Sequence, residues 1–253
     1  MNNYLTAKMK KILILGSSNT DMTVKTPTLP APGETVLGGV FTMSAGGKGA
    51  NQAVAAKRVG GDVSFICKVG NDVFGDNSIK HYEAEGIDVS GIIRSDKPSG
   101  VALITVDNDA ENCIVVASGA NLDFTDADIK ASEEALRSCD VLLMQLEIPV
   151  PAVLQAARIA HEAGAFVVLN PAPYAELPEE IFKYISLFIP NETELASFSG
   201  MPVVDKESAA AAARVLFDKG VGNMIVTMGS KGSLILDGGD PQFVQARKVK
   251  AVD

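Results

Sequence analysis

The chain has 253 residues, 47% of them hydrophobic and 21% charged, and a formal net charge of −9 at pH 7. This composition excludes collagen-like and low-complexity chains. The negative charge disfavours nucleic-acid binding, because phosphate backbones are negative too. The apolar runs fall well short of the ~20 residues of a membrane span, and the N-terminus lacks the apolar core of a signal peptide. We therefore expect a cytoplasmic protein with no nucleic-acid or membrane partner.

In the first half of the chain, the patterns predict a buried strand at 11–15, then an irregular, proline-punctuated stretch with short strands at 35–39 and 40–44. Helices are predicted at 49–59 and 74–85, and strands at 64–69, 101–106 and 113–117, the last two forming a hairpin.

The second half alternates regularly between the two kinds of element. Helices are predicted at 126–138, 150–163, 178–184, 192–198 and 206–219, and strands at 141–146, 166–169, 186–189 and 224–227, before a hairpin of 233–237 with 242–249. Such alternation is typical of an α/β fold with a doubly wound, mostly parallel sheet. The β-only segments at about 22–45 and 97–118 predict a small β-sheet that projects as a lid. We expect one domain over 1–253.

The three cysteines and two histidines give no sign of a metal site or a histidine-based enzyme. Cys67, Cys113 and Cys139 do not lie at zinc-ligand spacing. His81 and His161 fall in predicted helices beside charged residues, as solvated histidines do. A Ser-His-Asp or Cys-His arrangement is therefore a poor fit.

Polar residues follow several predicted strands, at the edge where open α/β sheets bind ligands. Asn19 and Asp21 follow the first strand, Glu147 a later one, and the motifs NPAP at 170–173, PNETE at 190–194 and GSKG at 229–232 follow others. The glycine-rich AGGKGAN at 45–51 opens a predicted helix, whose N-terminus favours an anion or a polar oxygen. This stretch matches neither a Walker A loop nor a dinucleotide fingerprint.

Each motif alone also has a simpler explanation. Asn19 and Asp21 could form an Asx turn, and Glu147 a solvated loop carboxylate. Asn191 and Glu194 have the spacing of a helix capping box, and 229–232 that of a β-turn. The glycines could serve only close packing of a helix on a strand. What favours a site is that all of them line one edge.

Taken together, GSSNTD (16–21), GGKGANQAVAA (46–56), MQLEIP (144–149), LNPAP (169–173), PNETE (190–194) and TMGSKGS (227–233) resemble the PfkB carbohydrate kinase family, and within it the ribokinases. The resemblance runs in order over nearly the whole chain from Lys11. It implies ATP-dependent phosphorylation of D-ribose to ribose 5-phosphate, and a homodimer formed through the lid.

The resemblance also implies roles for individual residues. The sugar hydroxyls would be held by Asn19, Asp21, Gly47, Lys48, Asn51 and Glu147, a mixture of donors and acceptors that suits a polyol. ATP would be bound by Asn191, Thr227, Gly229 and Gly232. Glu194 would help to place Mg²⁺ through water, which suits a cation that keeps most of its waters. Asp253 would be a ligand of an activating monovalent cation, K⁺.

The sequence departs from the family pattern where the chain stops. In ribokinases a T-x-A-G-D motif supplies the general base and the anion hole, and it would follow Asp253. We therefore expect no catalytic base within these residues, no C-terminal helices, an apolar strip on the sheet near 224–227, and little or no activity. The alternatives are another sugar or nucleoside kinase of this family, and a non-catalytic, truncated sugar-binding homologue. A Rossmann dehydrogenase is a distant third.

Overall fold

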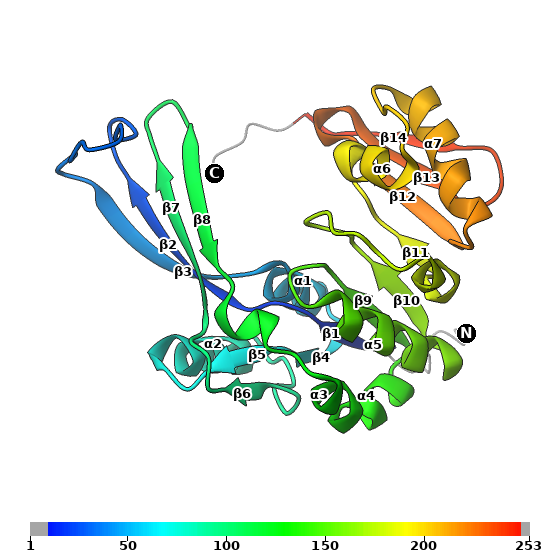
Figure 1. Cartoon of the computed structure of the whole chain (residues 1–253), viewed down its shortest axis with the longest axis horizontal. Helices are drawn as coiled ribbons and strands as arrows, with labels where there is room; N and C mark the ends of the chain where they lie inside the picture. The colour runs from blue at the N-terminus through cyan, green and yellow to red at the C-terminus, as the bar shows by residue number, and fades with distance from the viewer. Residues whose placement is uncertain (1–9, 249–253) are drawn as a thin grey trace, which may run out of the picture. The chain divides into compact units, whose positions relative to one another are not determined.

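The structure is a computed structural model that describes residues 10–248. The chain divides into two compact units, which we describe one at a time (Figure 1). The first unit holds the chain up to residue 132 together with 147–149, and the second holds 133–146 and the chain from 150 onward. Among the described residues, no helix has the length and apolar character needed to span a membrane.

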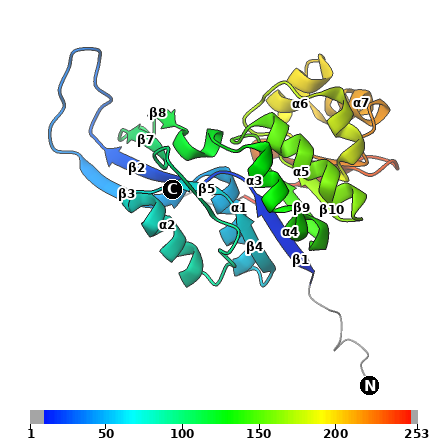
Figure 2. The same cartoon turned by 60° about the horizontal axis from the view of Figure 1, so that its bottom comes forward.

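The first unit contains a parallel pair of buried strands with a helix against it. Strand β1 (Lys11–Leu15) pairs in parallel with β4 (Asp62–Ile66), and α1 (Lys48–Arg58) packs on both (Figure 2). The remaining elements here are β5 (Lys68–Gly70), α2 (Val73–Ala84), β6 (Ile93–Ser95), the 3-10 turn η1 (Gly119–Leu122) and α3 (Asp126–Ala131).

A separate four-stranded sheet completes the first unit. Its strands are β2 (Asn19–Lys25), β3 (Val40–Gly46), β7 (Gly100–Val106) and β8 (Asn112–Ala117), in the order β3-β2-β7-β8 (Figure 1). Strand β2 is parallel to β7, and the outer two pairings are antiparallel. Both faces of this sheet carry exposed apolar side chains.

The second unit carries strands in the order β14-β13-β12-β11-β10-β9. Strands β9 to β12 are parallel, and the β13–β14 hairpin adds antiparallel strands at the edge. The elements in chain order are α4 (Glu133–Ser138), β9 (Val141–Met144), α5 (Val150–Glu162), β10 (Phe166–Leu169), η2 (Glu179–Tyr184), β11 (Leu187–Phe188), α6 (Glu192–Ser199), α7 (Lys206–Asp218), β12 (Asn223–Thr227), η3 (Gly229–Lys231), β13 (Gly232–Leu236) and β14 (Gln242–Gln245).

The two faces of this second sheet differ in burial. Met224, Val226 and Leu234 are fully buried, and α6 and α7 pack against their strands. Because side chains alternate along a strand, Ile225 and its cross-strand partner Ile235 face the other way, and both are only half-buried. The apolar strip expected near 224–227 is thus limited to this one pair, because Thr227 and Ser233 on the same face are polar.

The predicted α/β class with a mostly parallel sheet and a small second sheet is confirmed. Four segments differ in detail from the prediction. The strand predicted at 64–69 is divided into β4 and β5, and the helix at 126–138 is interrupted at Ser132. No strand forms at 35–39, whereas the polar segment Asn19–Lys25, expected to contain a turn, is a seven-residue strand.

Candidate functional site

Strand β2 brings Asn19 and Asp21 to one face of the small sheet. They are two residues apart in a strand, so their side chains point the same way. Opposite them on β3 lie Gly46 and Ser44. A Cβ atom on Gly46 would lie 2.1 Å from Oδ2 of Asp21, so the carboxylate covers the bare Cα of this glycine. The Asx turn considered above is thus wrong.

The glycine-rich stretch leads directly from β3 into α1. Gly47 has a φ of 90°, in the region that favours glycine, and the helix begins at Lys48. A Cβ on Gly49 would lie 2.5 Å from the backbone nitrogen of Ser17, so the first turn of α1 packs directly on the chain between β1 and β2. Asn51 lies one turn further along, on an exposed position of the same helix.

Glu147 is fastened to both of these segments. Its Oε2 accepts a hydrogen bond from the backbone N–H of Lys48 over 2.9 Å, and a second from the hydroxyl of Ser17. Its Oε1 lies 3.8 Å from Nζ of Lys48. A carboxylate at a helix N-terminus is stabilised by the first-turn N–H groups. Glu147 is therefore an ordered acceptor, one-quarter exposed, rather than a loosely solvated loop residue.

The charge of Glu147 acts on a second carboxylate of this cluster, Asp21. Burial, and then the negative charge of Glu147, raise the pKa of Asp21 above its ordinary value. A partly buried carboxylate next to another negative charge is stabilised by a ligand that donates hydrogen bonds to it. Sugar hydroxyls are such donors.

The residues predicted for nucleotide binding lie in the second unit. Asn191 caps α6: its Oδ1 accepts from the backbone N–H of Glu194, and Oε2 of Glu194 accepts from the backbone N–H of Asn191. The capping-box explanation is thus correct for their geometry. Thr227 bridges to Asn191 at the end of β12, and Gly229 and Gly232 bracket η3 with positive φ angles. Asp253 lies outside the described residues.

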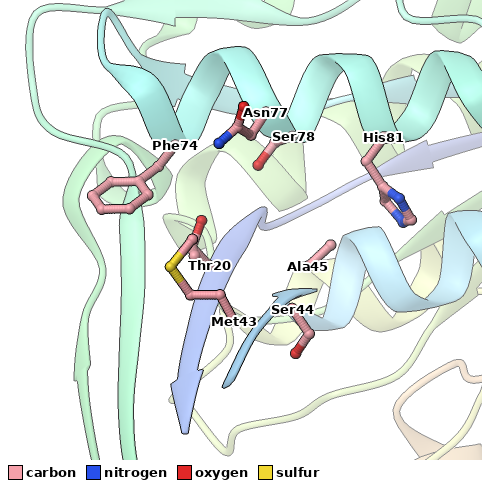
Figure 3. Close-up of a pocket in the computed structure, with 8 residues that line it drawn as sticks. All are labelled: Thr20, Met43, Ser44, Ala45, Phe74, Asn77, Ser78 and His81. Atoms are coloured by element: carbon pink, nitrogen blue, oxygen red, sulfur yellow. The ribbon is translucent and has the colours of Figure 1, made fainter. Parts of the chain in front are cut away.

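A cavity of about 190 Å³ lies between α2 and the strands β2 and β3 (Figure 3). Thr20, Met43 and Ala45 line one side, and α2 supplies Phe74, Asn77, Ser78 and His81 (Figure 3). Thr20 is one residue from both Asn19 and Asp21, so its side chain points away from theirs. The cavity lining also includes Ser44, the cross-strand neighbour of Asp21, so the cavity borders the cluster of predicted sugar residues.

Sequence reasoning missed Ser17 and Asn121. Ser17 stands beside Asn19 in the GSSNTD motif and holds Glu147, which lies 130 positions away in the chain. Asn121 lies in the turn after β8 and contacts Asn19. Ser17 closely follows β1, where a serine is unremarkable, and Asn121 follows β8 of the small sheet rather than a strand of the main sheet.

Among the described residues, no three histidine, cysteine or acidic side chains are grouped so as to hold a metal ion. The first unit instead offers amide donors, a lysine and two carboxylates beside a helix N-terminus. Such a mixture of hydrogen-bond donors and acceptors on an α/β fold suits a ligand rich in hydroxyl groups. A family model described as pfkB family carbohydrate kinase matches residues 9–253, and the chain belongs to this family.

Several relatives are similar over almost the whole chain. A ribokinase of Haemophilus influenzae is 41% identical and a deoxyribokinase of Salmonella typhi 40% identical; each alignment covers 96% of this chain and 80% of the relative. A bifunctional ribokinase/ribose-5-phosphate isomerase A of Fructilactobacillus sanfranciscensis is 41% identical, and the chain spans about half of its length, 46%. An Arabidopsis thaliana ribokinase structure, complexed with ribose and ATP, matches with a TM-score of 0.85 at 29% identity, covering 97% of this chain and 80% of the other.

Proposed function

We propose that the protein to which this chain belongs transfers the γ-phosphoryl group of ATP to D-ribose, giving ribose 5-phosphate. The observation that carries the proposal is the cluster of Asp21 and Glu147 with Asn19 and Lys48 in the first unit. Two fixed carboxylates accept hydrogen bonds from vicinal hydroxyls, while the amide and the ammonium donate to hydroxyl oxygens. Gly47 and Asn51, at the start of α1, complete the proposed sugar site.

The nucleotide is assigned to the second unit. Asn191, Thr227, Gly229 and Gly232 would contact ATP, and Glu194 would act on Mg²⁺ through water. Glu194 is 7% exposed, and the capping box engages its Oε2. Its Oε1 is left as the oxygen for this role. Mg²⁺ keeps several waters and needs few carboxylates, so a single glutamate fits. Mg²⁺ would neutralise charge on the phosphates, whereas the residues of this site would bind and orient ATP.

Other members of the same class remain candidates for the substrate. The deoxyribokinase and the ribokinase are equally similar to this chain, so identity does not choose between their sugars. Another family sugar or a nucleoside, and sugar binding without turnover, are the further alternatives. The monovalent cation stays a prediction, because its expected ligand, Asp253, lies outside the described residues. The cytoplasmic location also stays a prediction.

The small sheet is proposed to act as a lid and as the contact of a homodimer. Met43, Met22, Leu103 and Val115 are direct cross-strand neighbours, so they form one apolar row across all four strands. Three of them are about half exposed or more: Met43 by 48%, Leu103 by 55% and Val115 by 62%. A contiguous exposed apolar surface of this kind favours contact with another protein surface.

A sugar panel tests the proposal. Ribose, 2-deoxyribose, fructose and adenosine are each offered with ATP and Mg²⁺, and both ADP release and calorimetric binding are measured. Ribose should give the tightest binding and, where turnover occurs, the fastest ADP release. A preference for deoxyribose or adenosine would reassign the substrate, and binding without ADP release would favour the non-catalytic alternative. Failure of all four compounds to bind would overturn the proposal.

A further inference from the structure

Both ends of the Asn121 side-chain amide are hydrogen-bonded to residues around the start of β2. It lies in the turn η1 and is 99% buried. Its Oδ1 accepts from the backbone N–H of Ser18 over 2.9 Å. Its Nδ2 donates to the backbone carbonyl of Ser18 over 3.2 Å and to Oδ1 of Asn19 over 2.7 Å.

These contacts fix which way both amides point. A backbone N–H can only donate, so the atom of Asn121 that faces the N–H of Ser18 must be its oxygen. The nitrogen of Asn121 must then face Asn19. A nitrogen can only donate here, so the atom of Asn19 that receives this bond is its oxygen. The NH₂ group of Asn19 is therefore the end of this amide that is left for a ligand.

The residues packed around the Asn19 and Asn121 amides leave these two side chains little room to move. A Cβ on Gly100 would lie 2.1 Å from Oδ1 of Asn19 and 2.3 Å from Nδ2 of Asn121, so the two amides meet over a bare glycine. The turn that carries Asn121 is held at both ends: Ala120 N donates to the carbonyl of Pro98 over 2.8 Å, and Nζ of Lys68 donates to the carbonyl of Asp123 over 2.6 Å.

We propose that Asn121 is a positioning residue, which holds Asn19 as a hydrogen-bond donor toward the ligand. This inference rests on the proposed function and sharpens the chemistry of its substrate. A group that accepts from Asn19 and donates to the carboxylate of Asp21 must be both donor and acceptor, as a hydroxyl is. An ammonium group cannot accept, so an amino sugar with its ammonium at this position is excluded.

The first test uses the wild-type chain labelled with ¹⁵N. Both hydrogens of the Asn121 side-chain amide are bonded, so they should exchange with solvent at least ~10²-fold more slowly than those of the exposed Asn77. Those of Asn19, a residue that is 5% exposed, should exchange faster than those of Asn121 in the free protein and slow down when ribose is added. Exchange of the Asn121 amide as fast as that of Asn77 would overturn the inference.

The second test is Asn121→Asp, with Asn77→Asp as the control for the same chemical change. The aspartate can still accept from Ser18 but cannot donate to Asn19, so the Asn19 amide loses its partner. Ribose binding should weaken at least tenfold in Asn121→Asp and stay within twofold of wild type in Asn77→Asp.

A double variant separates positioning from general damage. In an Asn19→Ala background, Asn121→Asp should weaken ribose binding no further, because its effect passes through Asn19. An additional tenfold loss in that background would overturn the inference. If wild type binds no sugar, the proposed function fails, and the amide exchange of wild type still decides the role of Asn121.

Discussion

Glu147 accepts a hydrogen bond from the backbone N–H of Lys48, the first residue of α1, over 2.9 Å. The hydroxyl of Ser17 donates to the same carboxylate oxygen. A single side chain thus joins the start of α1 to the chain that enters β2. The other oxygen remains close to the Lys48 ammonium, where a ligand hydroxyl can reach it. Under the proposed function, structural support and ligand binding therefore both depend on one carboxylate.

Asp21→Asn should weaken sugar binding and stabilise the fold at neutral pH. Burial and then Glu147 raise the pKa of Asp21 above 3.8, so the folded state binds this proton more tightly than the unfolded state. The contribution of Asp21 to stability is therefore present at low pH and is lost as pH rises through the raised folded pKa. Asn removes that loss, and it also removes a charged acceptor worth about 1.5–3 kcal/mol, or roughly tenfold to 100-fold in Kd.

Urea unfolding at several pH values, together with ribose calorimetry, checks this prediction. The stability gain of Asp21→Asn should be largest near pH 7 and disappear toward pH 3. A variant that is less stable than wild type at pH 7, or that binds ribose equally well, would contradict it.

Gly46→Ala and Gly49→Ala should separate binding from folding. The new methyl group at residue 46 meets the Asp21 carboxylate, a side chain that can turn aside, so ribose affinity should fall about tenfold or more with a small loss of stability. At residue 49 it meets the Ser17 backbone, and the free energy of unfolding should fall by about 2–3 kcal/mol. Gly239→Ala, in an exposed turn, is the control. Equal effects of the two site variants on stability would refute the distinction.

Lys68→Met should destabilise the first unit by about 3 kcal/mol, because it leaves a buried charge pair half empty. The Lys68 side chain is 7% exposed, and its ammonium nitrogen lies 2.8 Å from Oδ2 of Asp128. Burial alone would raise the pKa of Asp128, but hydrogen bonds from Lys68 and Thr125 outweigh it and lower the pKa. The stability from this pair is thus present at neutral pH and is lost as pH falls through the lowered pKa.

Acid unfolding checks both parts of this prediction. The difference between wild type and Lys68→Met should shrink as the solution becomes acidic. Lys206→Met is the control, because its ion pair with Glu207 is solvent-exposed and should contribute less than about 1 kcal/mol. A Lys68→Met chain as stable as the control variant would show that the buried pair is not needed.

The double variant Leu103→Asp/Val115→Asp should convert the proposed dimer into a monomer. The two side chains are cross-strand neighbours in the exposed apolar row, so two carboxylates there disfavour burial in an interface. Val73→Asp is the control, since Val73 is an exposed apolar residue of α2 outside the small sheet. Light scattering measures the mass. A monomeric wild type, or a dimeric double variant, would contradict the assignment.

The sequence predicts the main α/β elements because their signals are local. Residues 166–169 form an uninterrupted apolar run, and the structure has β10 at those positions. The helix at Lys48–Arg58 is likewise expected, since alanines are bounded by glycines. Asn19–Lys25 is different: NTDMTVK is polar and lacks alternation, and it becomes a strand only through pairing with β3 and β7, which are distant in the chain.

The site was predictable only in part, for the same reason. Asn19, Asp21, Lys48 and Glu147 are marked by motifs at element ends, and the structure brings them together in the first unit. Asn121 carries no such mark. Its role follows from a contact with Asn19 across 102 positions of the chain, which the spacing of polar residues does not reveal.

The most direct test of the account is calorimetric titration of D-ribose into wild type and Glu147→Gln. Gln keeps the size of the side chain but not its charge, and Glu162→Gln, at an exposed position of α5, controls for the charge change. We predict saturable binding of one ribose per chain, unchanged in the control and weakened by roughly tenfold to 100-fold in Glu147→Gln. Equal ribose affinity in all three proteins would contradict a sugar site built on Glu147.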